Sequence, residues 1–362
     1  MIDEQQRQNA ERETVRKKLP DWTSVDALMF PRHISLEQCS SQQTAEYKAS
    51  IIDVPEGSAF IDLTGGFGVD CYYIGKQFDK ATYVEQNAEL CDIARHNYNV
   101  LGYDCEVICA DAVEYLSQID HAHLIYIDPA RRDANGKRTY AIKDCTPDIS
   151  TINDMLLAKA DKVLVKLSPM FDWHKAITDL KGVTEVHIVS SGNECKELLI
   201  LMENTVRPIK IVCVNDDCKV FFPLTKTSNL PLVKSEIEEH HYLYEPNTSI
   251  MKAGCFAEIA HKYGIYAISS NSHLFLSNEY IKDFPGRSFR IECVTSLNKK
   301  EVKEKLKDVT QANITTRNFP MSVDSLKKKL KIADGGNIYI FATTTKENRH
   351  ILFVCKKECD AG

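Results

Sequence analysis

Between residues 59 and 224 the sequence alternates short apolar runs with segments of helical pattern, and this alternation constrains the fold more than any other feature. The runs typical of strands are 59–63, 81–85, 105–110, 123–128, 162–166, 185–190, 209–214 and 219–224. We expect helices over 69–78, 87–101, 111–117, 149–159, 172–180 and 193–203. Strand and helix in alternation predict an α/β fold, with a mostly parallel sheet covered by helices on both faces. The last two runs predict an antiparallel hairpin at the edge of the sheet.

The chain is long for one average domain, and its pattern divides it into four segments. Residues 1–55 predict a helical N-terminal segment, with a polar helix over 1–19 and a second helix over 36–52. Residues 56–225 form the α/β domain, and 226–287 predict a small mixed α/β linker module. Residues 288–362 predict a small α+β domain, with strands over 290–294, 312–316, 338–343 and 350–355 and helices over 299–307 and 322–331.

The strongest local signal is a glycine-rich turn that follows the first expected strand. It reads Asp62-Leu63-Thr64-Gly65-Gly66-Phe67-Gly68-Val69-Asp70. Glycines let the backbone bend tightly and come close to a ligand, and free N–H groups at the following helix start then face that ligand. Nucleotide sites of several classes share such a turn, and a plain tight turn is the alternative interpretation.

Acidic residues also follow the next three expected strands. Glu85 ends the second strand, where a carboxylate accepts hydrogen bonds from both hydroxyls of a ribose. Asp111 follows the third strand, where it can accept from an adenine amino group, and Asp128 ends the fourth. Each acid alone is explained as well by a helix cap or a surface position. Together with Asp62 they indicate a ligand site, because open α/β sheets bind ligands at this edge.

With these residues in place, the chain resembles a class I S-adenosylmethionine-dependent methyltransferase. The glycine turn, Glu85, Asp111-Ala112 and Asp128-Pro129 occur in the family's order and approximate spacing. The likeness covers about residues 57–225. It implies a Rossmann-like seven-stranded sheet with an antiparallel last strand, which the hairpin over 209–224 suits, and S-adenosyl-L-methionine as the cofactor.

The resemblance also implies which residues contact that cofactor. The turn from Asp62 to Gly68 is implied to approach the methionine moiety, Glu85 the ribose, and Asp111 with Ala112 the adenine. The expected cofactor-binding residues are Asp62, Thr64, Gly65, Gly66, Phe67, Gly68, Glu85, Gln86, Asp111 and Ala112. The polar stretch 37–45 either folds over the methionine end or starts a helix with a capping serine. The turn is particularly similar to that of some ribosomal-RNA guanine-N2 methyltransferases.

The C-terminal segment carries a second resemblance. Its two matching stretches are Ala312-x-Ile314-x-Thr316-Arg317-Asn318-Phe319-Pro320 and Asp334-Gly335-Gly336. They are similar to the THUMP-like domain that accompanies certain uncharacterised bacterial methyltransferases. THUMP domains bind RNA, so this resemblance implies an RNA partner, either tRNA or rRNA.

The charge distribution points in the same direction. Residues 287–357 hold 16 Lys and Arg against 7 Asp and Glu, a net charge of +9 within a chain whose total is -6. A basic module beside an acidic body indicates a polyanionic partner. Solvated lysine-rich helix faces at 299–307 and 327–331 are the alternative explanation.

The residues around Asp128 bear on which atom receives the methyl group. Carbon-5 methylation of a pyrimidine needs a cysteine nucleophile, and neither Asp128-Pro129-Ala130-Arg131 nor the stretch 166–169 contains one. Amino-group methylation fits better, with Asp128 and Pro129 as acceptors for the amino group. Its usual motif continues with a second proline and an aromatic residue, which this chain lacks. Arg131 either takes the place of the aromatic by stacking on a base or holding a phosphate, or caps an exposed turn.

The remaining composition predicts a cytoplasmic protein without a metal. Thirteen cysteines are scattered, and no C-x-x-C pair occurs, so we expect reduced thiols and no metal site. No run of about 18 apolar residues is present, and the polar N-terminus lacks the apolar core of a signal peptide, so no membrane association is expected.

The sequence therefore predicts an S-adenosylmethionine-dependent methyltransferase that acts on RNA at a base nitrogen, with the guanine amino group favoured. Asp128, Pro129 and Arg131 are the expected catalytic residues. The alternatives are an RNA-binding protein that keeps the donor fold without catalysis, a nicotinamide-dependent oxidoreductase, and a methyltransferase with a protein or small-molecule acceptor. Against the oxidoreductase, this chain lacks the full Gly-x-Gly-x-x-Gly spacing that is typical of nicotinamide-binding turns.

Overall fold

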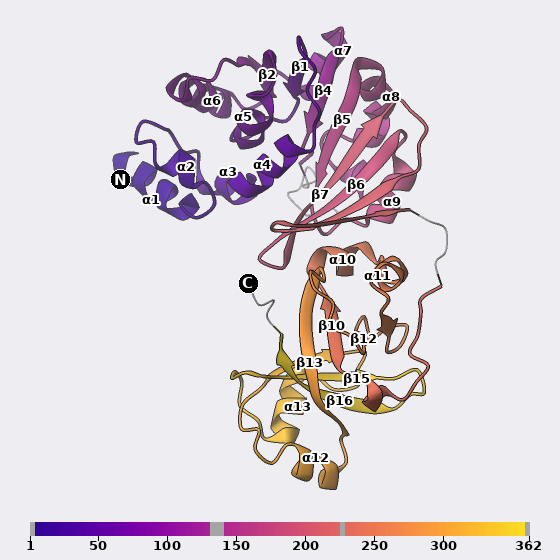
Figure 1. Ribbon diagram of the computed structural model, residues 1–362. Coiled ribbons are helices and arrows are strands. Elements are labelled where there is room, and N and C mark those ends of the chain that lie inside the picture. The colour runs from indigo at the N-terminus through magenta and orange to yellow at the C-terminus, as the bar shows by residue number, and fades with distance from the viewer. Residues whose placement is uncertain (1–3, 131–140, 225–228, 359–362) are drawn as a thin grey trace. The chain divides into compact units, whose positions relative to one another are not determined.

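The computed structural model describes residues 4–130, 141–224 and 229–358 and divides into two compact units (Figure 1). The first unit comprises Met1–Val189 and Lys196–Lys210, and the second comprises Ser190–Cys195 and Ile211–Gly362. A large, mostly parallel sheet with helices and a second, smaller C-terminal sheet confirm the predicted α/β class with α+β C-terminal modules.

The N-terminal segment is helical, as predicted, but its helices are shorter and more numerous. They are α1 (Glu4–Val15), α2 (Pro20–Thr23), α3 (His33–Gln38) and α4 (Gln42–Ser50). Pro20 is the first residue of α2, where its missing N–H and fixed φ are tolerated. The segment is anchored by aromatic packing, because Trp22 and Phe30 lie 5.0 and 5.8 Å from the ring of Phe67 in the core of the first unit.

The larger sheet has nine strands in the order β3-β2-β1-β4-β5-β7-β6-β8-β9. Their bounds are β1 (Ala59–Asp62), β2 (Lys80–Glu85), β3 (Glu106–Cys109), β4 (Ala122–Ile127), β5 (Ala160–Leu167), β6 (Val183–Ser191), β7 (Glu194–Glu203), β8 (Lys210–Asn215) and β9 (Cys218–Pro223). The first five pair in parallel, and β7 runs antiparallel to β5. The order β3-β2-β1-β4-β5-β7-β6 therefore supplies the expected seven strands with an antiparallel member, and β8 and β9 extend it.

Helices connect these strands. They are α5 (Val69–Gly75), α6 (Ala88–Leu101), α7 (Ala112–Gln118), α8 (Ile149–Lys159) and α9 (Trp173–Asp179), with a 3-10 turn η1 (Ile142–Asp144). Apart from α5, which begins after Gly68, each of these α-helices has a short polar capping side chain. Asn87, Asp111, Asp148 and Asp172 each accept a backbone N–H at the start of a helix. Figure 1 shows α5 and α6 on one side of the sheet and α8 on the other.

The segment 193–203 corrects one sequence prediction, because we expected a helix there and the structure has strand β7. Residues 197–202 are buried in an unbroken run, whereas a surface helix alternates buried and exposed positions with a period of 3.6. A strand covered on both faces reads as continuously apolar, and periodicity alone does not separate it from a buried helix. As a result, the antiparallel member of the seven-strand order is β7, and not the predicted hairpin over 209–224, whose two strands are β8 and β9.

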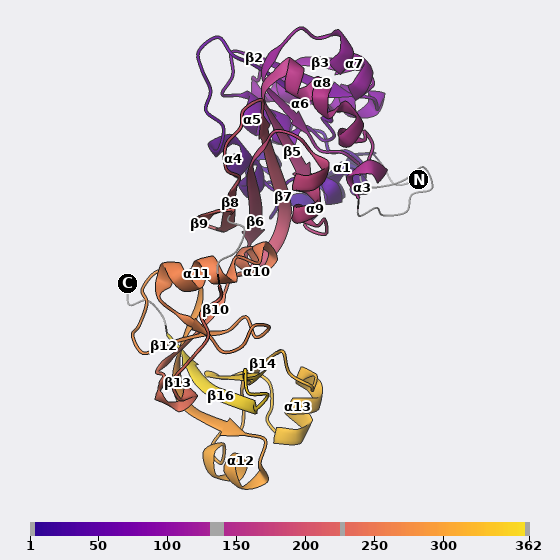
Figure 2. The ribbon, with the colours of Figure 1, turned by 90° about the vertical axis from the view of Figure 1, so that its right-hand side faces the viewer.

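The second unit contains a seven-stranded sheet in the order β11-β12-β10-β13-β16-β15-β14. Its strands are β10 (Tyr242–Pro246), β11 (Tyr266–Ala267), β12 (Phe275–Ser277), β13 (Gly286–Ser296), β14 (Asn313–Arg317), β15 (Ile338–Thr344) and β16 (His350–Lys357). Its helices are η2 (Ile237–Glu239), α10 (Thr248–Ala253), α11 (Phe256–Tyr263), α12 (Lys299–Lys305) and α13 (Val323–Leu330). In Figure 2, α12 lies beside β13 and α13 beside β14.

The side chains of β16 point alternately to the two faces of the sheet, and this divides the core of the unit into two layers. Phe353 and Cys355 pack with Phe289 and Leu276, whereas Leu352 and Val354 pack on the opposite side with side chains from α12 and α13. The central strand β13 pairs with β10 on one side and β16 on the other. Segments 226–287 and 288–362 therefore contribute strands to one sheet.

Candidate functional site

Two tyrosines shape the glycine turn after β1. A Cβ atom at Gly65 would lie 2.1 Å from the ring of Tyr83, and one at Gly68 would lie 2.4 Å from the hydroxyl of Tyr98. Both distances are far below van der Waals contact, so close packing excludes a side chain at either position. Gly68 also has a φ of +86°, which favours glycine. These two glycines are therefore explained by packing and do not by themselves indicate a ligand.

Gly66 differs because the space beside it is open. Its φ is +53°, and a Cβ atom there would meet only the carbonyl oxygen of Thr64, at 3.8 Å. The backbone itself is held firmly, since Gly66 N–H donates to Glu85 Oε2 at 3.0 Å and the Tyr83 hydroxyl donates to the Gly66 carbonyl at 2.6 Å. A fixed backbone with an open face lets a ligand approach the chain closely.

Glu85, at the end of β2, is oriented by the backbone on both of its oxygens. Oε2 accepts from Gly66 N–H, and Oε1 accepts from the N–H of Asn87 at 2.8 Å. Each carboxylate oxygen has a further lone pair for another donor. A carboxylate fixed in this way suits two neighbouring hydroxyl groups, such as those of a ribose.

Asp62, the last residue of β1, is a buried carboxyl group with one unsatisfied oxygen. Its residue is 1% exposed, and its Oδ1 accepts from the N–H of Thr64 at 2.9 Å. Oδ2 is buried and has no hydrogen-bond partner among the described residues. Burial raises the pKa of Asp62 well above its usual value, and the negative charges of Asp70 and Asp128 raise it further. A cation that met Oδ2 would relieve this unfavourable arrangement.

The other predicted cofactor-binding residues lie at positions that do not by themselves indicate a ligand. Asp111 is exposed and caps α7, with its Oδ1 accepting from the N–H groups of Val113 at 2.8 Å and Glu114 at 3.1 Å. Gln86 is exposed after β2, and Ala112 is the first residue of α7. The side chain of Phe67 is buried in the core, so only its backbone is available at the turn.

Asp128 follows β4 and is linked to both neighbouring strands. Its backbone N–H donates to Thr64 Oγ1 at 2.6 Å, which ties it to the glycine turn. Its Oδ2 accepts from Lys166 Nζ on β5, and the two side chains are 35% and 12% exposed. Pro129 is buried. Arg131, the third predicted catalytic residue, lies outside the described residues.

The strand order explains which of these residues meet. The strands β2, β1 and β4 are neighbours, and Asp62 is paired in register with Tyr83 and Tyr126, each two residues before Glu85 and Asp128. Asp62, Glu85 and Asp128 therefore gather around the turn at the carboxyl edge of the sheet. Asp111 lies at the same edge, beyond the end of β3, which neighbours β2.

A buried charged network lies beside this edge, and the sequence analysis did not identify it. Lys48 on α4 is fully buried and donates to both oxygens of Glu197 on β7, at 2.8 and 2.9 Å. Its Nζ also lies 3.2 Å from Asp70 Oδ1. Asp70 Oδ2 accepts from Ser40 Oγ and from the Tyr126 hydroxyl, both at 2.7 Å. The network thus joins α4, α5 and β7 with β4, the strand that precedes Asp128.

The pKa values in this network shift in different directions. Burial alone would raise the pKa of Asp70, but the charges of Lys48 and Lys166 and two hydrogen bonds together lower it. For Glu197, burial outweighs the same two lysines and raises the pKa. Burial would lower the pKa of Lys166, yet the charges of Asp128, Asp70 and Glu197 raise it, so Lys166 is a stable cation.

The stretch 37–45, which the sequence left between two interpretations, contributes to this network. Ser41 accepts from the N–H of Thr44 and caps α4, as the capping interpretation predicts. The preceding Ser40 is buried and bonds to Asp70, the last residue of the glycine-rich motif. Whether this stretch also contacts the methionine end of the donor stays a prediction.

Comparison with known proteins identifies the family. A crystal structure of a Porphyromonas gingivalis W83 protein, provisionally described as a methyltransferase, is 34% identical and has a TM-score of 0.89. The match covers 98% of this chain and 90% of that one. A family model described as THUMP domain-like matches residues 286–357, and one described as a ferredoxin-like domain matches 242–285. The chain belongs to the S-adenosylmethionine-dependent methyltransferases that carry a THUMP-like domain.

More distant structures are similar to parts of this methyltransferase. A SAM-dependent methyltransferase from Agrobacterium tumefaciens is 15% identical, with a TM-score of 0.33, over 45% of this chain and 61% of that one. A Listeria monocytogenes protein, provisionally described as a class I S-adenosylmethionine-dependent methyltransferase, is 9% identical, with a TM-score of 0.40. The match covers 57% of this chain and 74% of that one. No curated protein matches the sequence.

The residues of this methyltransferase fit the cofactor that the family implies. S-adenosylmethionine carries an ammonium group, a sulfonium centre, a ribose and an adenine. The unsatisfied Oδ2 of Asp62 fits a cationic group, and the open face of Gly66 fits a closely approaching chain. The oriented carboxylate of Glu85 fits a ribose.

Neither a metal-binding cluster nor a membrane-spanning helix is found in the described residues. Across the described residues, no group of three or more His, Cys, Asp or Glu side chains is arranged to hold a metal ion. Among the helices in that part of the chain, none combines the length and the apolar character that crossing a membrane requires.

Proposed function

We propose that this methyltransferase modifies RNA at a base nitrogen, with the exocyclic amino group of guanine as the favoured acceptor. The observation that carries the proposal is the pairing of two features in one chain. A methyltransferase sheet presents Asp128-Pro129 beside its glycine turn, and a strongly basic THUMP-like module follows it.

The RNA substrate is supported by the charge of the second module. The THUMP-like match over 286–357 coincides with the segment whose net charge is +9. Lysine and arginine contacts to phosphates provide most of the non-specific affinity of proteins for nucleic acids. In this proposal the module binds and positions the RNA, and the chemistry takes place at the edge of the large sheet.

The nitrogen acceptor is supported by the way Asp128 is held. Lys166 occupies Oδ2, so Oδ1 is the oxygen that accepts the N–H of a base amino group. The carbonyl group of Pro129 is the second proposed acceptor. With two acceptors, the chain orients the nitrogen lone pair without needing a nucleophile of its own.

The donor site is proposed to use the opposite side of the glycine turn. Asp62 holds the cationic methionine end, the backbone from Thr64 to Gly68 lies along it, Glu85 and Gln86 hold the ribose, and Asp111 with Ala112 holds the adenine. When bound there, S-adenosylmethionine supplies an activated methyl group. Because Thr64 also bonds to the N–H of Asp128, one turn sets the spacing between the donor and the acceptor.

The test compares methyl transfer by two matched aspartate variants. The full-length protein is incubated with methyl-labelled donor and RNA from cells that lack the protein, and label in the RNA is counted. We expect Asp128→Asn to lose transfer but to retain S-adenosylhomocysteine binding. Asp154→Asn removes the same charge at an exposed position on α8, where the carboxylate pairs with Lys181, and should transfer normally.

Two outcomes would contradict the proposal. If the wild-type protein transferred label to protein or small molecules but not to RNA, the substrate would be wrong. If it bound the donor and the RNA and transferred nothing to any cellular RNA, the non-catalytic alternative would be favoured.

A further inference from the structure

A buried glutamate in the second unit joins two arginines that come from separate strands. Glu245 on β10 has a side chain that is 4% exposed. Its Oε2 accepts from Arg287 Nε at 2.8 Å and from Nη2 of the same side chain. Its Oε1 accepts from Arg317 Nε at 3.2 Å and Nη2 at 2.9 Å. One carboxylate thus holds two guanidinium groups, one on each oxygen.

The three residues come from both matched domains. Glu245 lies in the ferredoxin-like match, and Arg287 and Arg317 lie in the THUMP-like match. Glu245 and Arg287 are direct partners between β10 and β13, whereas Arg317 is the last residue of β14, the edge strand at the far end of the sheet order. The cluster therefore depends on the folded sheet as a whole.

The electrostatics leave an excess of positive charge. One negative charge is shared between two guanidinium groups, which do not lose their protons in proteins. Burying a carboxylate is costly unless it is paired and hydrogen-bonded, and one arginine is enough to form such a pair. The second arginine therefore gives the cluster a net charge of +1.

Both arginines are oriented but still accessible. Their side chains are 38% and 37% exposed, although the carboxylate between them is buried. Each guanidinium group uses Nε and Nη2 on Glu245, and no hydrogen bond from Nη1 of either is found within the described residues. Arg287 is also steadied by the ring of Phe289, whose centre lies 5.5 Å from its guanidinium carbon.

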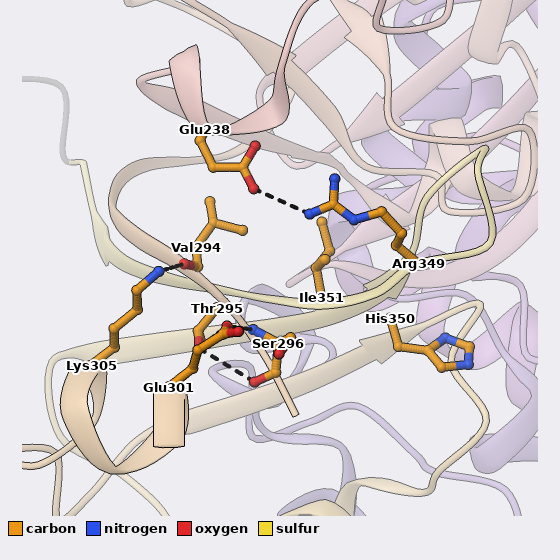
Figure 3. Close-up of a pocket in the computed structure, with 9 residues that line it drawn as sticks. All are labelled: Glu238, Val294, Thr295, Ser296, Glu301, Lys305, Arg349, His350 and Ile351. Atoms are coloured by element: carbon orange, nitrogen blue, oxygen red, sulfur yellow. Dashed lines mark hydrogen bonds and ion pairs between the residues drawn. The ribbon is translucent and has the colours of Figure 1, made fainter. Parts of the chain in front are cut away.

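A hollow at the other end of β13 also contains cationic side chains, but there each has its own partner (Figure 3). Its two cationic side chains point to partners within the hollow. Lys305 donates to the carbonyl of Val294 at 2.6 Å, and Arg349 pairs with Glu238 at 3.4 Å. Glu301 also lines it, so this hollow carries no excess of positive charge. The arginine pair at Glu245 is the stronger candidate for an anion.

We propose that Arg287 and Arg317, held by Glu245, form a clamp for a phosphate group of the RNA backbone. The planar guanidinium group matches the geometry of phosphate oxygens, and prior orientation lowers the entropy lost on binding. Phosphate contacts fix the register of a protein on nucleic acid without reading its sequence. The clamp rests on the proposed function, since it assumes that the methyltransferase binds RNA.

The test measures RNA affinity as a function of salt. A labelled RNA stem-loop is titrated with full-length wild type, Arg317→Lys, Arg287→Lys and Arg317→Gln over a series of salt concentrations. We expect Arg317→Gln to weaken binding and to reduce the slope of log K against log[salt] by about 1, as for one lost phosphate contact. The lysine variants keep the charge but lose the planar fork, and should weaken binding by a smaller factor.

The matched control is Arg290→Gln. Arg290 is on the same strand as Arg287, is 54% exposed and lies near Glu292 and Glu358. The Arg290→Gln substitution removes one positive charge from the same module, at a residue that does not contact Glu245. It should leave the slope of log K against log[salt] unchanged. Thermal unfolding and S-adenosylhomocysteine binding of each variant show whether it is folded.

The outcomes separate this inference from the proposed function. If wild type binds the RNA but the arginine variants keep its affinity and slope and only unfold at lower temperature, the cluster is structural and the clamp is wrong. An equal effect of Arg290→Gln would also overturn it, since general charge would then explain the binding. If wild type itself binds no RNA, the proposed function fails and the clamp with it.

Discussion

Lys166, near the end of β5, forms an ion pair with Oδ2 of Asp128, immediately after β4, and in the proposed function this contact leaves Oδ1 to face the substrate. The strands β4 and β5 are parallel neighbours. Lys166 does not itself contact the acceptor in this account, and acts as a positioning residue for Asp128.

Replacing Lys166 tests that role. Lys166→Met should lower kcat by about 100-fold, the effect of a misplacement of about 1 Å at a reacting centre. KM for the RNA and affinity for S-adenosylhomocysteine should change little. Lys166→Arg keeps the charge and should recover part of kcat. Steady-state kinetics of both variants provide the measurement, and an unchanged kcat for Lys166→Met would refute the positioning role.

As pH rises and Asp62 ionises, the free energy of unfolding should fall, whereas the affinity for the donor should rise. The pKa of Asp62 is raised in the folded protein, so the folded state holds the proton more tightly than the unfolded state. Stability contributed by this group is present below the unfolded pKa, near 3.8, and is lost as pH rises through the folded value. Binding of a cationic donor needs the ionised form, so donor affinity should rise over the same range.

The variant Asp62→Asn isolates both effects. It should remove this part of the pH dependence from chemical unfolding curves and should weaken S-adenosylhomocysteine binding at neutral pH. Asp154→Asn is the matched control. A donor affinity that did not depend on pH in wild type, or that survived in Asp62→Asn, would show that Asp62 does not meet the cationic group.

The two adjacent glycines of the turn should respond differently to alanine. Gly65→Ala places a Cβ atom 2.1 Å from the Tyr83 ring and should destabilise the fold strongly. Gly66→Ala meets no close atom, and its positive φ costs about 1–2 kcal/mol. Gly66→Ala should therefore fold and yet lose donor affinity. Thermal unfolding and calorimetry separate the two, and normal donor binding by Gly66→Ala would exclude a close approach at this face.

The buried network should show strong coupling between Lys48 and Glu197. Lys48→Met leaves two buried carboxylates without their main counter-charge and should lower the free energy of unfolding by about 3–5 kcal/mol. Glu197→Gln in the Lys48→Met background removes one of those carboxylates and should restore part of the loss. A double-mutant cycle from denaturant unfolding measures the coupling. Additive effects would mean that the two residues do not stabilise each other.

Much of the fold was predictable because its signals are local. The alternating runs depend on a few neighbouring residues, and so do the capping positions that the sequence offered at Asp111 and within 37–45. The segment 193–203 was assigned wrongly because a continuously buried strand has no period to detect. Its strand identity is decided by β5, whose paired residues lie 31 (Leu167 with Leu198) to 41 (Lys162 with Glu203) positions earlier.

The site was predictable only in part, for a related reason. Acids that follow successive strands can be found from spacing alone, so the positions of Asp62, Glu85 and Asp128 at one edge follow from the sequence. Lys48 and Lys166 give a weaker signal, a lysine within an otherwise apolar or small-residue stretch. Their partners are distant in sequence, and only the packing of α4 against α5 and of β4 against β5 brings the charges together.

The most direct test of the account is calorimetric titration of the full-length protein with S-adenosylhomocysteine and, separately, with NAD. We expect one binding site for S-adenosylhomocysteine, which Glu85→Gln weakens and Asp154→Asn leaves intact, and no binding of NAD. Binding of NAD in place of S-adenosylhomocysteine, or donor binding that ignores Glu85, would contradict the claim that this edge of the sheet holds the methyl donor.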